Sequence, residues 1–154
     1  MINKNLFLVL LILVLFACKK EDTPAPASYT AMSDTPVIQL ITVIPTMVNQ
    51  FKDSIVFTIG YKDGDGDIGF KNADSLALYL IDSRMNITEK YHIPPLTPDS
   101  TKVNIQGTLR IVLDHTALLN DSSKAETTTY TIKLKDRANH WSNSIVSKTI
   151  SINP

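Results

Sequence analysis

The feature that most constrains the fold is an alternation of apolar and polar residues, which recurs along the chain after Pro36. In the segment 103–113, for example, Val, Ile and Leu residues alternate with Asn, Gln, Thr and Arg. This period of two places one row of side chains in a core and the other in water, which is typical of antiparallel β-strands. The pattern predicts strands at residues 37–44, 54–62, 76–81, 86–93, 103–113, 127–135 and 145–152.

Seven strands with polar turns and no long helical pattern favour an all-β fold, an antiparallel seven-stranded immunoglobulin-like sandwich spanning residues 36–154. The disulfide of antibody domains is not expected, because Cys18 is the only cysteine. In this topology, the loop after the second strand and the loop before the last strand lie at the same end. We therefore expect residues 63–75 and 135–144 to be neighbours at one tip.

The N-terminal residues are typical of an export signal. Leu6–Phe16 is an unbroken apolar run of 11 residues, which is shorter than the ~20 that span a membrane and typical of a signal peptide. We interpret residues 1–17 as a signal peptide and 18–35 as Cys18 plus a flexible linker. Lys19–Thr35 would extend at most ~50 Å. The alternative to a signal peptide that directs modification of Cys18 is an ordinary signal peptide that happens to precede a cysteine.

Composition and motifs exclude several functions. Lys plus Arg and Asp plus Glu number 15 each, and the basic residues are scattered, so we expect no nucleic-acid partner. No nucleophile elbow, phosphate loop or zinc-protease motif occurs. The histidines, at positions 92, 115 and 140, show no metal-ligand spacing. We therefore expect a protein that is not an enzyme.

The segment "DGDGD" concentrates negative charge. Asp63, Asp65 and Asp67 alternate with Gly64 and Gly66, and two such charges ~4 Å apart repel by about 1 kcal/mol even in water. A divalent cation would reverse the sign of this energy, and Ca²⁺ takes six to eight oxygen ligands. The pattern predicts a structural calcium ion, with a solvated Asp-Gly turn as the alternative.

Three further residues are candidate ligands. The spacing of the loop is similar to that of EF-hand calcium loops, which implies the Gly69 carbonyl and Asp74, the twelfth residue from Asp63. Ile68 departs from that pattern, because a glycine is expected there, and the flanking segments are strands. Asp136 is expected to reach the ion from the neighbouring loop, and a simple turn aspartate is its alternative.

The loop before the last strand contains a second candidate site. Arg137, His140 and Trp141 are predicted to contact a glycan or an envelope protein at the tip, because tryptophan stacks on sugars and anchors protein interfaces. Alternatively, Trp141 folds back and caps the sandwich.

Several short segments together resemble a set of Bacteroidota lipoproteins. These segments are the lipobox-like "LFAC" ending at Cys18, the charged "KKED" after it, "DGDGDIG" and "DRANHWSN". In "DRANHWSN", Asn139 and His140 stand where these lipoproteins usually have glycine and asparagine. The resemblance implies a lipid on Cys18 and a place in the outer membrane at the cell surface. We expect a non-catalytic binding or accessory module, with a purely structural subunit of a larger assembly as the alternative.

Overall fold

The computed structural model describes residues 31–85 and 87–154, and these residues form an all-β domain without helices. None of them forms a helix long and apolar enough to cross a membrane. The predicted signal peptide, Cys18 and the first part of the linker lie outside the described residues. The compact unit begins at Ala31, five residues before the expected boundary, because residues 31–35 contact the domain.

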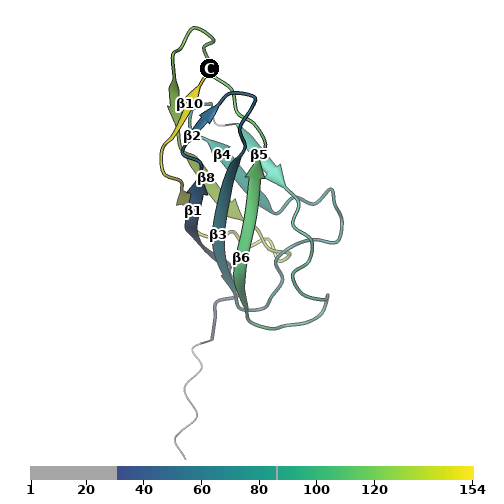
Figure 1. Ribbon diagram of the computed structural model, residues 1–154. Coiled ribbons are helices and arrows are strands. Elements are labelled where there is room, and N and C mark those ends of the chain that lie inside the picture. The colour runs from purple at the N-terminus through teal and green to yellow at the C-terminus, as the bar shows by residue number, and fades with distance from the viewer. Residues whose placement is uncertain (1–30, 86) are drawn as a thin grey trace, which may run out of the picture. The chain divides into compact units, whose positions relative to one another are not determined.

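One layer of the domain is a three-stranded antiparallel sheet (Figure 1). Its order is β1 (Val37–Ile44), β3 (Ile55–Asp63) and β6 (Ile105–Leu113). β3 lies in the centre and pairs along its whole length with β6, from Ile55 opposite Leu113 to Asp63 opposite Ile105. The central strand therefore delivers Asp63 to one end of the domain.

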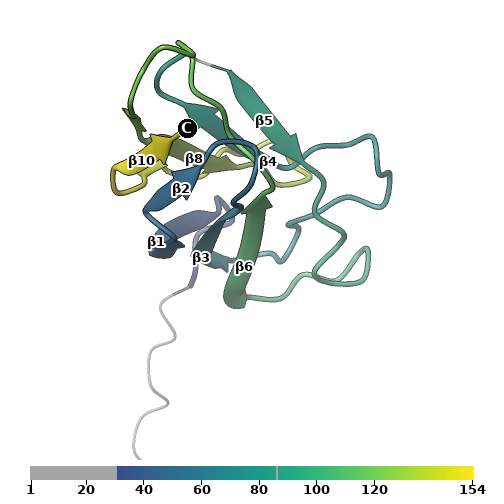
Figure 2. The same cartoon turned by 45° about the horizontal axis from the view of Figure 1, so that its top comes forward.

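The other strands form two further groups (Figures 1 and 2). The four-stranded group has the order β5 (Thr88–Tyr91), β4 (Leu78–Asp82), β8 (Tyr130–Leu134) and β9 (Ile145–Val146). The three-stranded group has the order β2 (Met47–Asn49), β10 (Ile150–Asn153) and β7 (Glu126–Thr128). Only Thr129 separates β7 from β8, so the chain links the two groups directly.

The observed strands differ from the seven predicted ones in three ways. The predicted strands 127–135 and 145–152 are each divided in two. One cause of the division is Ser147, whose hydroxyl accepts a hydrogen bond from the Tyr130 N–H at 2.9 Å in place of a backbone partner. β2 was not predicted, since three residues are too few to show a period. β2 also pairs with β10 in parallel, which corrects the purely antiparallel expectation.

The core is built by the predicted alternation. In β3, Ile55, Phe57 and Ile59 are fully buried, and the residues between them are not. The opposite layer contributes Leu78, Leu80, Tyr130, Ile132 and Leu134. The rings of Phe57 and Tyr130 meet edge to face, with centroids 5.3 Å apart. Each large side chain buried in this way contributes about 1.5–3 kcal/mol, so this core positions the strand ends that carry the polar sites.

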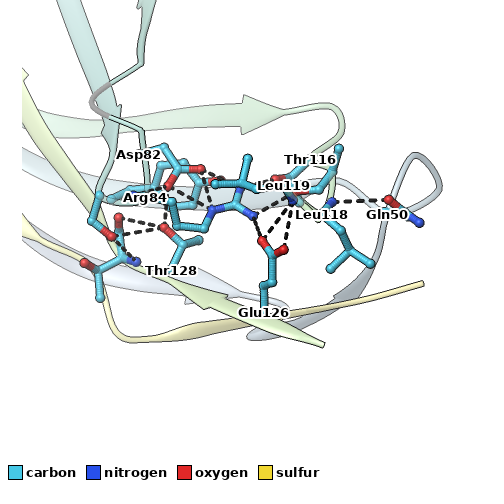
Figure 3. Close-up of polar contacts among 12 residues, drawn as sticks. Gln50, Asp82, Arg84, Thr116, Leu118, Leu119, Glu126 and Thr128 are labelled. Atoms are coloured by element: carbon cyan, nitrogen blue, oxygen red, sulfur yellow. Dashed lines mark hydrogen bonds and ion pairs between the residues drawn. The ribbon is translucent and has the colours of Figure 1, made fainter. Parts of the chain in front are cut away.

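A partly buried ionic network holds the end of the domain away from Asp63 (Figure 3). Asp82 ends β4, and Arg84 donates to its carboxylate from Nη2 at 2.7 Å and from Nε at 3.2 Å. Arg84 Nη1 donates to Glu126 at 2.9 Å and to the Ala117 carbonyl at 2.8 Å. Thr128 also donates to Asp82, at 2.6 Å. The network joins the β4–β5 turn to β7 and to the loop after β6.

We predict that Arg84→Ala will lower the free energy of unfolding by about 3 kcal/mol, because it leaves the Asp82 carboxylate buried without its cation. Burial alone would raise the pKa of Asp82, but hydrogen bonds from Arg84 and Thr128 hold it below 3.8. A carboxyl with a lowered pKa stabilises the fold above its unfolded pKa and loses that contribution as the pH falls. The difference between wild type and variant should therefore shrink below about pH 4.

Urea titrations at several pH values measure this effect. Arg110→Ala is the control, because Arg110 is exposed on β6. Equal losses for the two substitutions would show that the network does not stabilise the fold.

Candidate metal centre

The aspartate loop, residues 63–70, is fixed by backbone hydrogen bonds from three distant segments. Gly64 N–H donates to the Ser33 carbonyl at 2.9 Å, and Phe70 N–H donates to the Ile93 carbonyl at 2.8 Å. From the other side, Arg137 N–H donates to the Asp67 carbonyl at 3.2 Å. The loop is therefore an integral part of the domain, unlike a solvated turn.

Its glycines are required by the backbone and by close neighbours. Gly66 has φ of 74°, and a Cβ there would lie 2.6 Å from the Val103 carbonyl oxygen. Gly69 has φ of 90°, and a Cβ there would collide with the Pro94 carbonyl. Both positions favour glycine, because other residues seldom adopt this left-handed backbone region.

The three alternating aspartates converge inside this loop. Asp63, Asp65 and Asp67 each offer a carboxylate oxygen, and these atoms lie within 4.8 Å of one another. Asp63 is fully buried, and its Oδ2 accepts the Asp67 N–H at 2.9 Å. Asp67 Oδ2 accepts the Ala138 N–H at 2.9 Å. One oxygen of each of these two side chains is thus used to fix its orientation.

The remaining oxygens have no partner. Oδ1 of Asp63, Oδ1 of Asp65 and Oδ1 of Asp67 are all buried and accept no hydrogen bond from any described residue. An unpaired buried polar atom is destabilising by about 1–3 kcal/mol, and by more when it is charged. Three such oxygens in one small volume are the donor set that a cation requires, so the cluster can hold a metal ion.

The electrostatics agree with this conclusion. Burial, followed by the charge of Asp65, raises the pKa of Asp63 to about 6. Burial, followed by the charge of Asp136, also raises the pKa of Asp67. Without a cation the folded state therefore disfavours the ionised cluster, and a bound cation would relieve that penalty.

Two of the predicted ligands lie outside the group of three. The Gly69 carbonyl accepts a hydrogen bond from Arg137 Nη1 at 3.0 Å, so a cationic group already occupies its oxygen. Asp74 is exposed, and its own N–H donates to the Asn72 side chain at 3.0 Å. The structure therefore gathers the three alternating aspartates, and ligation by the Gly69 carbonyl and by Asp74 stays a prediction.

Asp136 is fully buried beside the cluster, but its carboxylate serves another group. Its Oδ1 accepts the His140 N–H at 2.7 Å, and its Oδ2 lies 3.0 Å from His140 Nδ1. The charge of Asp136 raises the pKa of His140. Asp136 is close enough to raise the pKa values of Asp63 and Asp67, so it adds negative potential without belonging to the group of three.

The three residues predicted to contact a ligand do not form a single site. Arg137 reaches the Gly69 carbonyl and His140 pairs with Asp136, as described above. Trp141 lies against Tyr79 on β4, with ring centroids 4.9 Å apart. The tryptophan therefore contacts the outer face of the four-stranded sheet, and its contact with a ligand stays a prediction.

Sequence reasoning missed the groups that orient the cluster. The N–H of Ala138 and the carbonyl of Ser33 act through the backbone, so their residue types carry no signal. Tyr79 was detectable in principle, because it occupies an outward position of a strand.

Comparisons of the chain with protein-family models, with curated proteins and with solved structures found no match.

We predict that Asp63→Asn will stabilise the metal-free protein at pH 7, by on the order of 1 kcal/mol. A carboxyl whose folded pKa is raised from 3.8 to about 6 contributes stability that is present below its unfolded pKa and lost as the pH rises through 6. In chelator, the unfolding free energy of the wild type should therefore decrease from pH 4 to pH 7 relative to that of the variant. Thermal melts of both proteins across this range measure the difference.

The exposed Asp121 provides a control, since Asp121→Asn should follow the wild-type pH profile. A parallel profile for Asp63→Asn would show that the carboxyl is not destabilised in the folded state.

Proposed function

We propose that this protein is a lipid-anchored envelope module, in which a structural calcium ion locks a β-sandwich that binds or supports a partner without catalysis. The observation that carries the proposal is the set of three buried carboxylate oxygens that lack any hydrogen-bond partner. A cation satisfies all three at once, and no other group among the described residues does so.

Calcium fits the cluster better than magnesium does. Ca²⁺ accepts irregular sets of six to eight oxygens, whereas Mg²⁺ requires near-ideal octahedral geometry and keeps several waters. Asp63, Asp65 and Asp67 supply three oxygens, and water would complete the shell. The burial of Ile68 accounts for the departure of the loop from the EF-hand pattern, which has a glycine at this position. The Ile68 side chain is fully buried in the core, so the sixth position anchors the loop to the sandwich.

The same proposal includes an immunoglobulin-like topology. The order β1-β3-β6 and the order β5-β4-β8-β9 correspond to the two sheets of such a sandwich. The proximity of the aspartate loop to residues 136–143, here named the tip loop, also supports it. Ile68 forms an isolated bridge with Asp136, as expected for two loops at one end.

The ion would join three segments that are far apart in sequence. The aspartate loop contacts the tip loop through Ala138 and the entry segment 31–35 through Ser33. Without a disulfide, a metal cross-link of this kind is an available way to stabilise the end of the sandwich.

The anchor is inferred from sequence. Cys18 ends a lipobox-like segment, and a diacyl modification there would hold the mature chain at a membrane. Because the chain enters the domain beside the aspartate loop, the free tether would comprise the 12 residues Lys19–Thr30 and reach at most ~37 Å. The metal-binding end would then be the end joined to the membrane.

A structural subunit of a larger outer-membrane assembly is the second candidate. Apolar side chains are exposed on and after β1, with exposed fractions of 61% for Ile44, 65% for Met47 and 69% for Phe51. Such residues mark interaction surfaces when they gather. Co-purification with a fixed set of envelope proteins would favour this candidate over a free binding module.

We predict that millimolar calcium will raise the melting temperature of residues 28–154 by about 10 °C over the value in chelator. The estimate assumes calcium at about 100 times its dissociation constant, which stabilises by about 2.7 kcal/mol. Magnesium should give a smaller shift. Asp65→Ala should abolish the calcium shift, because it removes one of the three oxygens.

Asp74→Asn is the matched control, because Asp74 belongs to the same segment but is exposed. Its calcium shift should equal that of the wild type. If chelation changes the melting of neither wild type nor Asp65→Ala, the loop does not bind calcium.

We also predict that Cys18→Ser will release the protein from membranes. The Cys18 thiol is the acylation site in the proposed anchor, and the hydroxyl of the serine that replaces it would not be acylated. Metabolic labelling with a palmitate analogue, followed by detergent phase separation, measures this in a Bacteroidota host. Cys18→Ser protein that still carries label and stays in the detergent phase would refute the anchor.

A further inference from the structure

An aromatic pair lies on the outer face of the four-stranded sheet. The Trp141 indole meets the Tyr79 ring edge-on, with centroids 4.9 Å apart and an interplanar angle of 78°. Trp141 is 43% exposed. The tip loop places it there through an isolated bridge to Lys135, so the rings form part of the surface and do not fill the core.

Three lysines surround this pair. Tyr79 is directly opposite Lys90 on β5 and Lys133 on β8, so all three point to the same side of the sheet. Lys135 follows two residues after Lys133 and therefore shares that face. The Lys90 ammonium lies 5.2 Å from the centroid of Tyr79, and the Lys135 ammonium lies 5.7 Å from that of Trp141.

The positive charge of this face is not balanced locally. None of the outward positions of β4, β5, β8 and β9 is acidic, because Glu89 and Asp82 pair with the core-facing Leu80 and Tyr130. Within the described part of the chain, no carboxylate forms an ion pair with any of the three lysines. Since the whole chain has equal numbers of acidic and basic residues, this is a local segregation of charge.

We propose that this face binds an acidic polysaccharide, with Tyr79 and Trp141 contacting the apolar faces of sugar rings and the lysines pairing with their carboxylates. The proposal rests on the proposed role as a binding module and names its ligand class. A uronic acid combines an apolar ring face with a carboxylate in a single unit. An aromatic ring with an ammonium group 5–6 Å away can contact the apolar ring face while the ammonium pairs with the carboxylate.

The arrangement suits a chain of such units. Neighbouring strands are ~4.8 Å apart, so the backbones of Lys90 and Lys133 are separated by roughly 10 Å with Tyr79 between them. Cations on both sides of a ring can therefore pair with carboxylates that recur along a linear chain. The pleated face of four strands is extended, as a linear polymer requires.

Two other anionic partners fit less well. Single-stranded nucleic acid stacks successive bases on aromatic side chains, whereas the two rings here are nearly perpendicular. A membrane surface favours apolar side chains that protrude into the lipid, whereas the exposed part of Trp141 lies on a sheet face that also carries three lysines.

Intrinsic fluorescence tests the proposal directly, because Trp141 is the only tryptophan in the chain. The calcium-loaded protein, residues 28–154, is titrated with a hexasaccharide of alternating glucuronate and N-acetylglucosamine. The same hexasaccharide with its carboxyls reduced to alcohols is the matched neutral ligand. We expect a saturable change in emission with the acidic ligand, at least about tenfold weaker binding of the reduced one, and an affinity that falls with salt.

Variants assign the binding to this face. Lys133→Gln and Lys135→Gln should each weaken binding several-fold, and Trp141→Ala should weaken it at least about tenfold by calorimetry. Lys62→Gln is the control, because Lys62 is exposed on β3 in the other layer, and it should bind like the wild type. The two lysine variants keep the test valid if Trp141→Ala fails to fold.

Four outcomes would overturn the proposal. These are no binding of the acidic hexasaccharide, equal binding of the reduced one, unchanged binding in all three variants, and equally tight binding of oligo-dT or phosphatidylglycerol vesicles. Melting of the same samples with calcium and chelator is measured in parallel. Saccharide binding without a calcium shift would reject the metal site alone, and a calcium shift without saccharide binding would reject this face alone.

Discussion

The organisation of one end of this domain depends on the repulsion among three buried carboxylates. β3 is central and buried, so its last residue, Asp63, is carried into the protein interior. Asp65 and Asp67 then bring two further charges within 4.8 Å. Desolvation raises the free energy of each ionised group, and their mutual repulsion raises it further. Both penalties fall when a carboxylate takes up a proton or when a cation binds between the oxygens, so this cluster can hold a metal ion.

At the opposite end of the domain, the Asp82 carboxylate is stabilised in a different way. Asp82 is held by the guanidinium of Arg84, which donates to it, to Glu126 and to the Ala117 carbonyl. Both the cation and the carboxylates of that network are side chains of the protein. Hydrogen bonds from Arg84 and Thr128 lower the pKa of Asp82. The pKa of Asp63 is raised instead, because burial and then the charge of Asp65 disfavour its ionised form. The two ends therefore differ: the carboxylates of the Arg84 network pair with a cationic side chain, whereas three carboxylate oxygens of the aspartate cluster have no partner among the described residues.

Local patterns predicted much of this structure, and tertiary contacts decided the rest. Alternation located the segment 37–44 without error and placed the other long strands to within two residues, because burial of one face follows directly from a period of two. The convergence of Asp63, Asp65 and Asp67 was also readable from their spacing. The position of Trp141 was not, since it depends on Tyr79, which is 62 residues away in the sequence. Gly69 and Asp74 were expected as ligands from an analogy in spacing, and their part in the site stays a prediction.

The tip loop links the two proposed sites. Ala138 N–H donates to Asp67 Oδ2, so the aspartate cluster helps to position this loop, and three residues later the same loop places Trp141 against Tyr79. An ion bound by the aspartates would fix Asp67 and, through Ala138, restrict the backbone that carries the indole. The entry segment 31–35 also contacts the aspartate loop, through the Ser33 carbonyl. Calcium would thereby stabilise the geometry of the binding face without contacting the ligand.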